Sequence, residues 1–383
     1  MKIFIIGAQP SSLINFRGDF IRKLVSTKKH DVVLMASGAS DKEIEIIKDL
    51  GGEYRNYPVS RNGLNPVDDL KTLVSLCSVF KYNSPDIVFA YTIKPIIWGG
   101  IASRLIGRNQ FYALITGLGY AFQPGGVKKN FLVRLVTFLY RIALSNSKAV
   151  IFQNPDNMRE FIDKGIVPPG RCYLVNGSGV DLERFKKSPL SKENNFLLIA
   201  RLLGDKGIRE YFRAAEIVKL KYPCANFYLL GPEDPSPDGI RKEEVLGWQS
   251  KGIIVYCGAT KDVRPFIKDA NIFVLPSYHE GMPRTVLEAM AMGRPILTTD
   301  VPGCKETVVN GENGWLIEKA SVEQLAERMI WFIENPDQWQ EMGDKSYTLA
   351  REKFDVHKVN AKILEIIGLD YPQGEKKNNE KVV

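Results

Sequence analysis

Two glutamates lie eight positions apart in the second half of the chain, on either side of the point where a helix is expected to begin. Glu280 follows the apolar, strand-like run Ile272–Leu275, and Glu288 falls about one turn into the helical stretch. The amino end of a helix carries free N–H groups and the positive end of the helix dipole, so it suits an anionic ligand. We therefore expect an anion to bind at this turn, although the spacing also fits a solvated turn residue and an exposed helix position.

Two cations five positions apart, Arg201 and Lys206, flank a turn that contains Gly204. The turn follows the run Phe196–Ala200 and leads into a helix expected to start near Ile208. It can bring both side chains onto one diphosphate, where each charge-assisted contact contributes about 1.5–3 kcal/mol. Taken alone, the segment more often indicates a solvated basic turn, so its interpretation depends on the glutamate pair.

These residues must be positioned by a fold in which short β-branched runs alternate with longer helical patterns. That alternation predicts an α/β fold with two doubly wound parallel sheets, which bind ligands at the carboxyl ends of their strands. A polar segment at Asp181–Asn195 separates the two halves and predicts a linker. The expected strands are Lys2–Ile6, Asp31–Ala36, Asp86–Tyr91, Phe111–Thr116 and Ala149–Phe152, then Phe196–Ala200, Asn226–Leu230, Ile253–Cys257, Ile272–Leu275 and Pro295–Thr298.

The segment 280–295, EGMPRTVLEAMAMGRP, resembles the nucleotide-sugar site of retaining glycosyltransferases of family 4, which have the GT-B fold. The run RLLGDKG at 201–207 is similar to the R-x4-K-G motif of the same family. The resemblance implies that Glu280 holds the donor sugar, that Glu288 binds the nucleotide ribose, and that Arg201 and Lys206 bind the leaving diphosphate. It also implies donor contacts from the start of the helix, at Gly281, Met282, Arg284 and Thr285.

The first half offers weaker candidates at the expected strand ends, where a phosphate of the donor or acceptor is expected. They are Gly7 after the first strand, Lys94 and Thr116 after later strands, and Arg17, one turn into the following helix, for which a plain exposed arginine is an equal alternative. The G-x-G-x-x-G fingerprint of dinucleotide binding is absent after the first strand. No histidine stands where many family members place one, so Thr116 or backbone groups are the expected replacement.

The resemblance also implies a domain division. Residues 1–182 are expected to form the acceptor-binding domain, with a C-terminal helix at about 356–368 packing back on it. Residues 195–355 are expected to form the nucleotide-sugar domain. The charged, apolar-poor tail 370–383 is expected to be disordered.

Five dispersed cysteines without CxxC spacing are typical of a reduced cytoplasmic protein. No D-x-D cluster or other metal-ligand spacing stands where a divalent ion is expected, so we predict no cofactor and no metal. No apolar run approaches the roughly 18 residues of a membrane span. We therefore expect a soluble protein, or one that rests on a membrane surface.

The positive charge is concentrated in the first half. Residues 1–190 hold 26 Lys and Arg against 15 Asp and Glu, a net charge of +11, while the whole chain carries +8. No acidic residue occurs from Ile87 to Pro155, and within that stretch apolar residues recur at helical spacing from Phe131 to Ile142. This pattern fits a core helix with a solvated basic face. It also fits an interfacial helix on an anionic membrane, where each basic residue contributes about 1 kcal/mol.

The segments 91–95, YTIKP, and 116–120, TGLGY, also resemble a bacterial subgroup that builds polysaccharides on a polyprenyl carrier. The resemblance therefore implies a retaining glycosyltransferase that moves a sugar from a UDP-sugar donor to a polyprenyl-diphosphate-linked glycan, with an N-acetylhexosamine as the first choice of sugar. The expected location is cytoplasmic, at the inner face of the plasma membrane, in bacterial polysaccharide synthesis. The alternatives are a UDP-sugar 2-epimerase of the same fold and a non-catalytic nucleotide-binding protein. Nucleic acid is not an expected partner, because no basic motif interleaved with aromatic residues is present.

Overall fold

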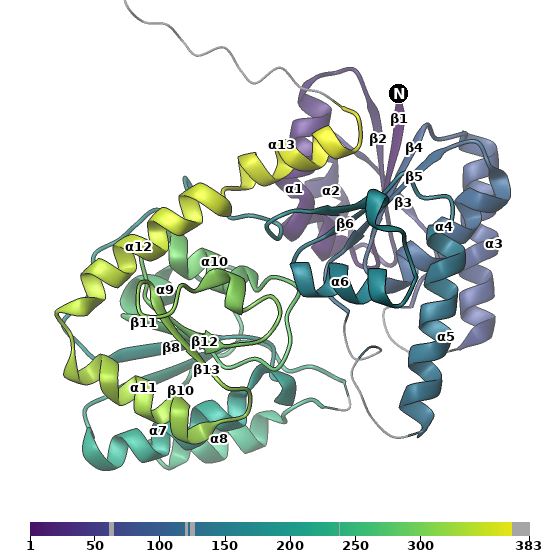
Figure 1. Ribbon diagram of the computed structural model, residues 1–383. Coiled ribbons are helices and arrows are strands. Elements are labelled where there is room, and N and C mark those ends of the chain that lie inside the picture. Colours follow the sequence, from purple (N-terminus) through teal and green to yellow (C-terminus); the bar gives the residue numbers. More distant parts are fainter. Residues whose placement is uncertain (61–64, 119–121, 123–126, 237, 370–383) are drawn as a thin grey trace, which may run out of the picture.

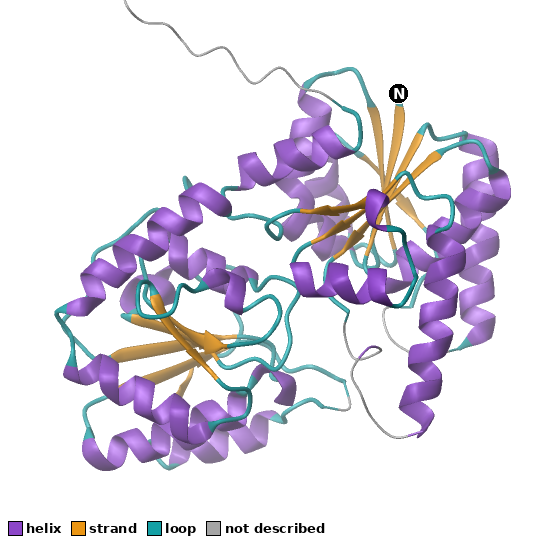
Figure 2. Ribbon diagram, viewed as in Figure 1, coloured by secondary structure: helices purple, strands orange, loops and turns teal. Residues whose placement is uncertain are grey.

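The computed structural model describes residues 1–60, 65–118, 122, 127–236 and 238–369. It contains two parallel β-sheets, each covered by helices on both faces (Figures 1 and 2). The first sheet has the strand order β3-β2-β1-β4-β5-β6-β7, and the second has the order β10-β9-β8-β11-β12-β13. The predicted fold class, two doubly wound Rossmann-like units, is confirmed. The segment 370–383, for which the sequence predicts disorder, lies outside the described residues.

The first sheet is built from strands that are buried on both faces, as their continuous apolar runs predict. Helices α3, α4, α5 and α6 pack on one face, and α1, α2 and α13 pack on the other. Its strands are β1 (Lys2–Ile6), β2 (Asp31–Ala36), β3 (Glu53–Asn56), β4 (Ile87–Tyr91), β5 (Gln110–Ile115), β6 (Ala149–Phe152) and β7 (Cys172–Leu174). Its helices are α1 (Pro10–Ser26), α2 (Asp41–Asp49), α3 (Pro66–Asn83), α4 (Ile93–Ile106), α5 (Val127–Leu144) and α6 (Pro155–Asp163).

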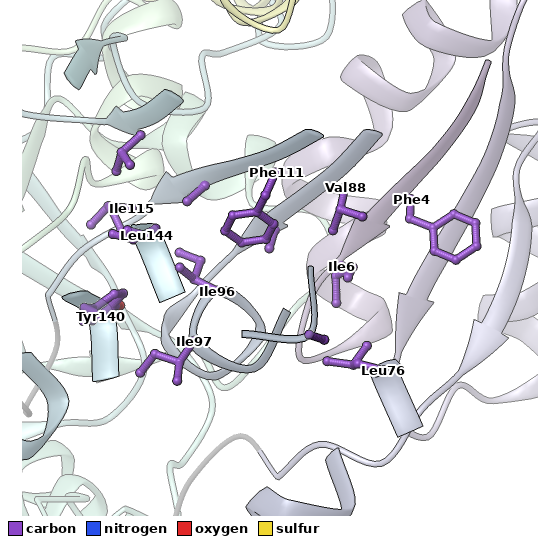
Figure 3. Close-up of a cluster of buried hydrophobic side chains, with 14 of the residues drawn as sticks. Phe4, Ile6, Leu76, Val88, Ile96, Ile97, Phe111, Ile115, Tyr140 and Leu144 are labelled. Atoms are coloured by element: carbon purple, nitrogen blue, oxygen red, sulfur yellow. The ribbon is translucent and has the colours of Figure 1, made fainter. Parts of the chain in front are cut away.

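Figure 3 shows the larger core of this unit, where alternate residues of neighbouring strands meet the helices. Phe4, Val88 and Phe111 from β1, β4 and β5 pack with Leu76 of α3 and Tyr140 of α5. Each such fully buried side chain stabilises the fold by about 1.5–3 kcal/mol relative to exposure. This packing holds the carboxyl ends of β1, β4 and β5 in fixed positions.

The second sheet repeats the design. Helices α7, α8 and α11 cover one face, α9 and α10 cover the other, and α12 contributes side chains to both clusters. Its strands are β8 (Asn195–Ile199), β9 (Asn226–Leu230), β10 (Val255–Tyr256), β11 (Ile272–Leu275), β12 (Ile296–Thr299) and β13 (Gly314–Ile317). Its helices are α7 (Ile208–Lys221), α8 (Lys242–Ser250), α9 (Arg264–Asp269), α10 (Arg284–Ala291), α11 (Val322–Glu334) and α12 (Gln338–Lys353).

The structure contains three strands that the sequence did not predict, and all three lie at sheet edges. They are β3, β7 and β13, each three or four residues long. An edge strand is paired on one side only and is often short and polar, as in the run EYRN of β3, so it lacks the apolar signature of a central strand. The expected strand Ile253–Cys257 is likewise reduced to the two residues of β10, at another edge.

The chain returns to the first sheet at its C-terminal end. The amide of Val356 donates to the carbonyl of Val180 at 3.0 Å, and the amide of Val180 donates to the carbonyl of Phe354 at 2.7 Å. Helix α13 (Val356–Ile366) then packs on the first sheet, where Val359 and Ile363 join the cluster that includes Leu13 of α1. Figure 1 shows α12 and α13 running from the second unit to the first.

Candidate functional site

The loop that carries Glu280 lies against the carboxyl ends of two strands of the first sheet. A methyl group on Gly281 would stand 1.8 Å from the carbonyl oxygen of Thr116, which follows β5. The Nδ2 of Asn154, which follows β6, donates to the Gly281 carbonyl at 2.7 Å. Because Asn154 is fully buried, this hydrogen bond is shielded from water. The candidate site therefore lies where the carboxyl edges of both sheets meet, as the fold predicts.

Glu280 and Lys206 form an ion pair in the site, with Nζ and Oε1 separated by 2.7 Å. Both side chains are mostly buried, with 18% of Glu280 and 14% of Lys206 exposed. Burial acts to lower the pKa of Lys206, but the charges of Glu280 and Asp205 outweigh it and raise that pKa. Lys206 is therefore a cation at neutral pH. It lies beside Glu280, so the structure brings together one residue from each of the two sequence motifs.

Arg201 is also paired with a carboxylate, that of Asp234 in the loop after β9. Asp234 is 5% exposed, whereas the Arg201 side chain is 41% exposed. Burial acts to raise the pKa of Asp234, but hydrogen bonds from Ser236 and the charge of Arg201 lower it overall. The lowered pKa keeps Asp234 ionised at neutral pH, where it orients the guanidinium while part of the Arg201 side chain stays exposed.

The turn between the two cations is tightly packed against the same loop. The Asp205 amide donates to the carboxylate of Asp238 at 2.7 Å, and a methyl group on Gly204 would stand 2.6 Å from that carboxylate. Burial raises the pKa of Asp205, with Lys206 opposing the shift and Glu280 adding to it. Arg201, Lys206 and Glu280 thus share one electrostatic neighbourhood with the aspartates of the loop.

Glu288 is buried rather than being an exposed helix position, with 7% of the residue exposed. It accepts from Nε of Arg284, one turn earlier in α10, at 2.9 Å. Burial raises the pKa of Glu288, and the adjacent Arg284 opposes that shift. The side chain of Thr285 donates to the Ile199 carbonyl at 3.2 Å, while Met282 packs on Gly177. The side chains of Thr285 and Met282 are thus engaged within the protein. Contacts between these residues and the donor stay a prediction, and they would be made by the backbone N–H groups.

On the first-sheet side, Gly7 and Arg17 both contact Tyr91, the last residue of β4. A methyl group on Gly7 would stand 2.3 Å from the Tyr91 hydroxyl, and the Gly7 carbonyl accepts from the Tyr57 hydroxyl at 2.8 Å. The Arg17 guanidinium lies over the Tyr91 ring, 5.5 Å from its centre. Arg17 is 2% exposed, so the alternative of a plain exposed arginine is wrong.

The remaining first-half candidates are less available. Lys94 is bound to Asp69 of α3 at 2.8 Å, and the indole of Trp98 donates to the same carboxylate at 3.3 Å. Thr116 meets the second unit through its carbonyl group, which lies against Gly281. Neither arrangement tests a role in acceptor binding, which stays a prediction.

Sequence reasoning missed two residues of the site, Asn154 and Asp234, and it did not predict the backbone conformation of Thr92. Asn154 and Asp234 act through contacts between distant segments, and nothing in their local sequence indicates those partners. Thr92 follows β4 with φ of 67°, an outlier for a β-branched residue, and its hydroxyl is buried without a partner among the described residues. Such backbone strain is concentrated at functional sites, but it appears only in the folded chain.

Among the described residues, no group of three or more His, Cys, Asp and Glu side chains could hold a metal ion. Within the same part of the chain, no helix is long and apolar enough to cross a membrane.

Two opposed Rossmann-like units with paired cations and glutamates at their junction define a glycosyltransferase of the GT-B class. Residues 180–349 match the family of group 1 glycosyl transferases, and residues 18–154 match the family described as glycosyl transferase 4-like. The chain therefore belongs to the group 1 glycosyltransferases, also called family 4. The predicted family, fold and enzyme class are confirmed.

Two curated relatives and one solved structure illustrate the match. The chain is 28% identical over 349 residues to the N,N'-diacetylbacillosaminyl-diphospho-undecaprenol alpha-1,3-N-acetylgalactosaminyltransferase of Campylobacter jejuni, covering 88% of this chain and 90% of that protein. It is 25% identical to the UDP-Gal:alpha-D-GlcNAc-diphosphoundecaprenol alpha-1,3-galactosyltransferase of Escherichia coli, covering 71% and 73%. The structure of Anabaena HepE in complex with UDP superposes with a TM-score of 0.76 at 18% identity, covering 96% and 100% of the two chains.

Proposed function

We propose that this glycosyltransferase moves a sugar from a UDP-sugar to a glycan carried on a polyprenyl diphosphate, with retention at the anomeric carbon. The observation that carries the proposal is the mostly buried Lys206–Glu280 ion pair, on a loop that lies against the first sheet, with Arg201 at the start of the turn that leads to Lys206. It combines two cations for a diphosphate with a carboxylate for a sugar. An N-acetylhexosamine is the proposed sugar, by similarity to the Campylobacter relative, whose name specifies that transfer.

In the proposed reaction, the bond between the anomeric carbon and the donor phosphate breaks, and the acceptor hydroxyl forms the new glycosidic bond on the same face. Negative charge grows on the departing diphosphate, and Arg201 and Lys206 stabilise it there. The departing phosphate oxygen takes the proton of the acceptor hydroxyl, which balances the step. Glu280 orients the sugar, and Glu288 holds the ribose of the nucleotide.

The ion pairs have a consequence for donor binding. A diphosphate that reaches Lys206 competes with Glu280 for the same ammonium group, so Glu280 becomes available to the sugar as the phosphates arrive. Asp234 stays bound to Arg201 through its buried carboxylate and can hold the guanidinium in place throughout. These contacts support a site that is arranged before the donor binds.

We propose the same division of labour between the two units that the sequence predicts. Residues 1–182, with the returning helix at 356–368, bind the acceptor, and residues 195–355 bind the donor. The names of both curated relatives contain a diphosphate-linked undecaprenol, which supports a lipid-linked acceptor at the inner face of the plasma membrane.

The function is tested by incubating the purified chain with a panel of UDP-sugars and a short-chain polyprenyl diphosphate that carries one sugar. We expect UDP to be released and mass spectrometry to show a product that is one sugar heavier than the acceptor. NMR should show that the anomeric carbon of the transferred sugar keeps the configuration it had in the donor. A UDP-sugar 2-epimerase would instead convert the nucleotide sugar without acceptor and without releasing UDP. Binding of UDP with no turnover on any donor would point to a non-catalytic nucleotide-binding protein.

Metal independence is a separate prediction. The proposed site neutralises the diphosphate with Arg201 and Lys206, so we expect the initial rate with EDTA to stay within about twofold of the rate without it. An enzyme that binds the diphosphate through a metal ion would instead lose most of its activity. The measurement is UDP release with and without EDTA, using chelated substrate stocks. Complete loss of activity that Mg²⁺ or Mn²⁺ restores would contradict the site as described.

A further inference from the structure

The buried guanidinium of Arg17 has no acidic partner in the described part of the chain. Its Nε and NH1 atoms are shielded from water and have no hydrogen-bond acceptor among the described residues. Burial lowers the pKa of Arg17 to about 10, so the group remains charged at neutral pH. A buried charge ordinarily requires a partner of opposite charge, because desolvation costs several kcal/mol.

The surroundings of Arg17 add positive charge instead of compensating it. Arg284, at the start of α10 in the second unit, lies close enough for its charge to lower the pKa of Arg17 further. The Arg284 guanidinium is centred 5.3 Å from the ring of Phe16, the neighbour of Arg17. Within the described residues, Arg284 pairs with one carboxylate, that of Glu288, so the two arginines and this glutamate leave an excess of one positive charge.

The Arg17 guanidinium packs on the ring of Tyr91, which is buried and held by a hydrogen bond. The Tyr91 ring lies under the guanidinium, and the Tyr91 hydroxyl is 2.8 Å from that of Ser12 at the start of α1. Tyr91 is 2% exposed and precedes the strained residue Thr92. Arg17 is therefore held at the carboxyl edge of the first sheet, facing the start of α10, rather than swinging freely to the surface.

We propose that Arg17 of the first unit and Arg284 of the second bind one phosphate group of a substrate between them. This inference rests on the proposed function in taking the junction of the two units as the substrate site and in assigning Arg201 and Lys206 to the donor. A diphosphate can come from the nucleotide or from the lipid carrier. The carrier is the favoured source, because Arg201 and Lys206 already provide for the donor on the second sheet, whereas Arg17 belongs to the first. The bound phosphate then joins the two units, because each contributes one of its cations.

The test uses Arg17→Met, which keeps an unbranched side chain of similar shape and removes the charge, with Arg22→Met as the matched control. Arg22 lies on the same helix, is 63% exposed and pairs with Asp19. Thermal unfolding and isothermal titration are measured for each variant with geranyl diphosphate, with UDP, and without ligand. Since the measurement is binding and not turnover, it remains decisive even if the proposed reaction is wrong.

We expect the free Arg17→Met protein to have a Tm at or above that of the unchanged protein, because an unpaired buried charge is removed. Its affinity for geranyl diphosphate should fall at least about tenfold, as expected for loss of a charge-assisted contact, while UDP binding is unchanged. Loss of UDP affinity in place of geranyl diphosphate affinity would keep the phosphate site but assign it to the donor. A lower Tm with both affinities intact would overturn the proposal and make Arg17 a packing residue.

Discussion

Replacing Lys206 with alanine is expected to lower kcat by about 10²–10³-fold, and Arg201→Ala should lower it by a similar factor. Both cations are placed to meet charge that develops on the leaving diphosphate, and removal of one such stabilising group costs about 2.7–4 kcal/mol. The loss should appear in kcat more than in KM for the donor, because the contact strengthens in the transition state. The measurement is steady-state UDP release over a range of UDP-sugar concentrations.

The ion pair with Glu280 makes a stability control necessary. Lys206→Ala leaves the Glu280 carboxylate without its partner at 18% exposure, and an unpaired, mostly buried charge destabilises a fold. The double variant Lys206→Ala with Glu280→Gln removes both charges and should recover part of any loss in Tm, but no activity. Lys221→Ala is the matched control, since Lys221 and Glu334 also lie 2.7 Å apart but at 60% and 45% exposure. Near-normal kcat in both Lys206→Ala and Arg201→Ala would remove these residues from the mechanism.

The central strands could be predicted from sequence because burial on both faces imposes an unbroken apolar run. Strand β4, IVFAY, is fully buried along its length, whereas the edge strand β3, EYRN, contains no such run. The apolar run of a central strand can be read from the local sequence. An edge strand such as β3 is defined by pairing with a neighbouring strand, which the local sequence does not show. That is why the central strands could be predicted from the sequence while the edge strands β3, β7 and β13 could not.

The site shows the same limit. Residue type and spacing identified Glu280 and Lys206, but the ion pair joins positions 74 residues apart and requires the folded sheet. The burial of Arg17 had a local signal, because it occupies the apolar face of α1 with Leu13 and Ile21. A cation on that face is either a packing residue or the binding partner of an anion, and the chain sequence alone does not distinguish these. Asn154 gave no signal, since its partner is a backbone carbonyl in the other unit.

The second large effect is expected at the membrane. Helix α5 lies beside α4 in the first unit (Figure 1) and exposes apolar side chains one turn apart: Phe131, Leu135 and Phe138 are 69%, 41% and 55% exposed. Arg134 is exposed on the same helix, in a stretch without acidic residues. An exposed apolar stripe flanked by cations is the pattern of a helix that lies in an anionic lipid interface.

Changing Lys128, Lys129, Arg134 and Arg141 to glutamine should weaken binding to anionic vesicles by up to about 1 kcal/mol per charge. The side chains of Lys128 and Lys129 lie outside the described residues, so their contribution rests on sequence. Arg141 donates to the Lys164 carbonyl at 2.5 Å, so its share should be the smaller one. The measurement is co-sedimentation with phosphatidylglycerol vesicles at low and high salt, and binding of the unchanged protein should fall as salt is added.

The matched control changes four exposed lysines to glutamine: Lys192 in the linker, and Lys242, Lys261 and Lys268 in the second unit. Because the net charge changes equally, a loss confined to the α5 variant shows that position matters and not overall charge. Phe131→Ser with Phe138→Ser should reduce the binding that remains at high salt, since that part depends on burial of apolar area. Activity on a water-soluble acceptor should survive all these changes, while activity on an acceptor embedded in vesicles should drop with the binding. If the α5 variant and the control bind equally, or if neither the variants nor the unchanged protein binds, α5 has no interfacial role and the acceptor reaches the cleft by another surface.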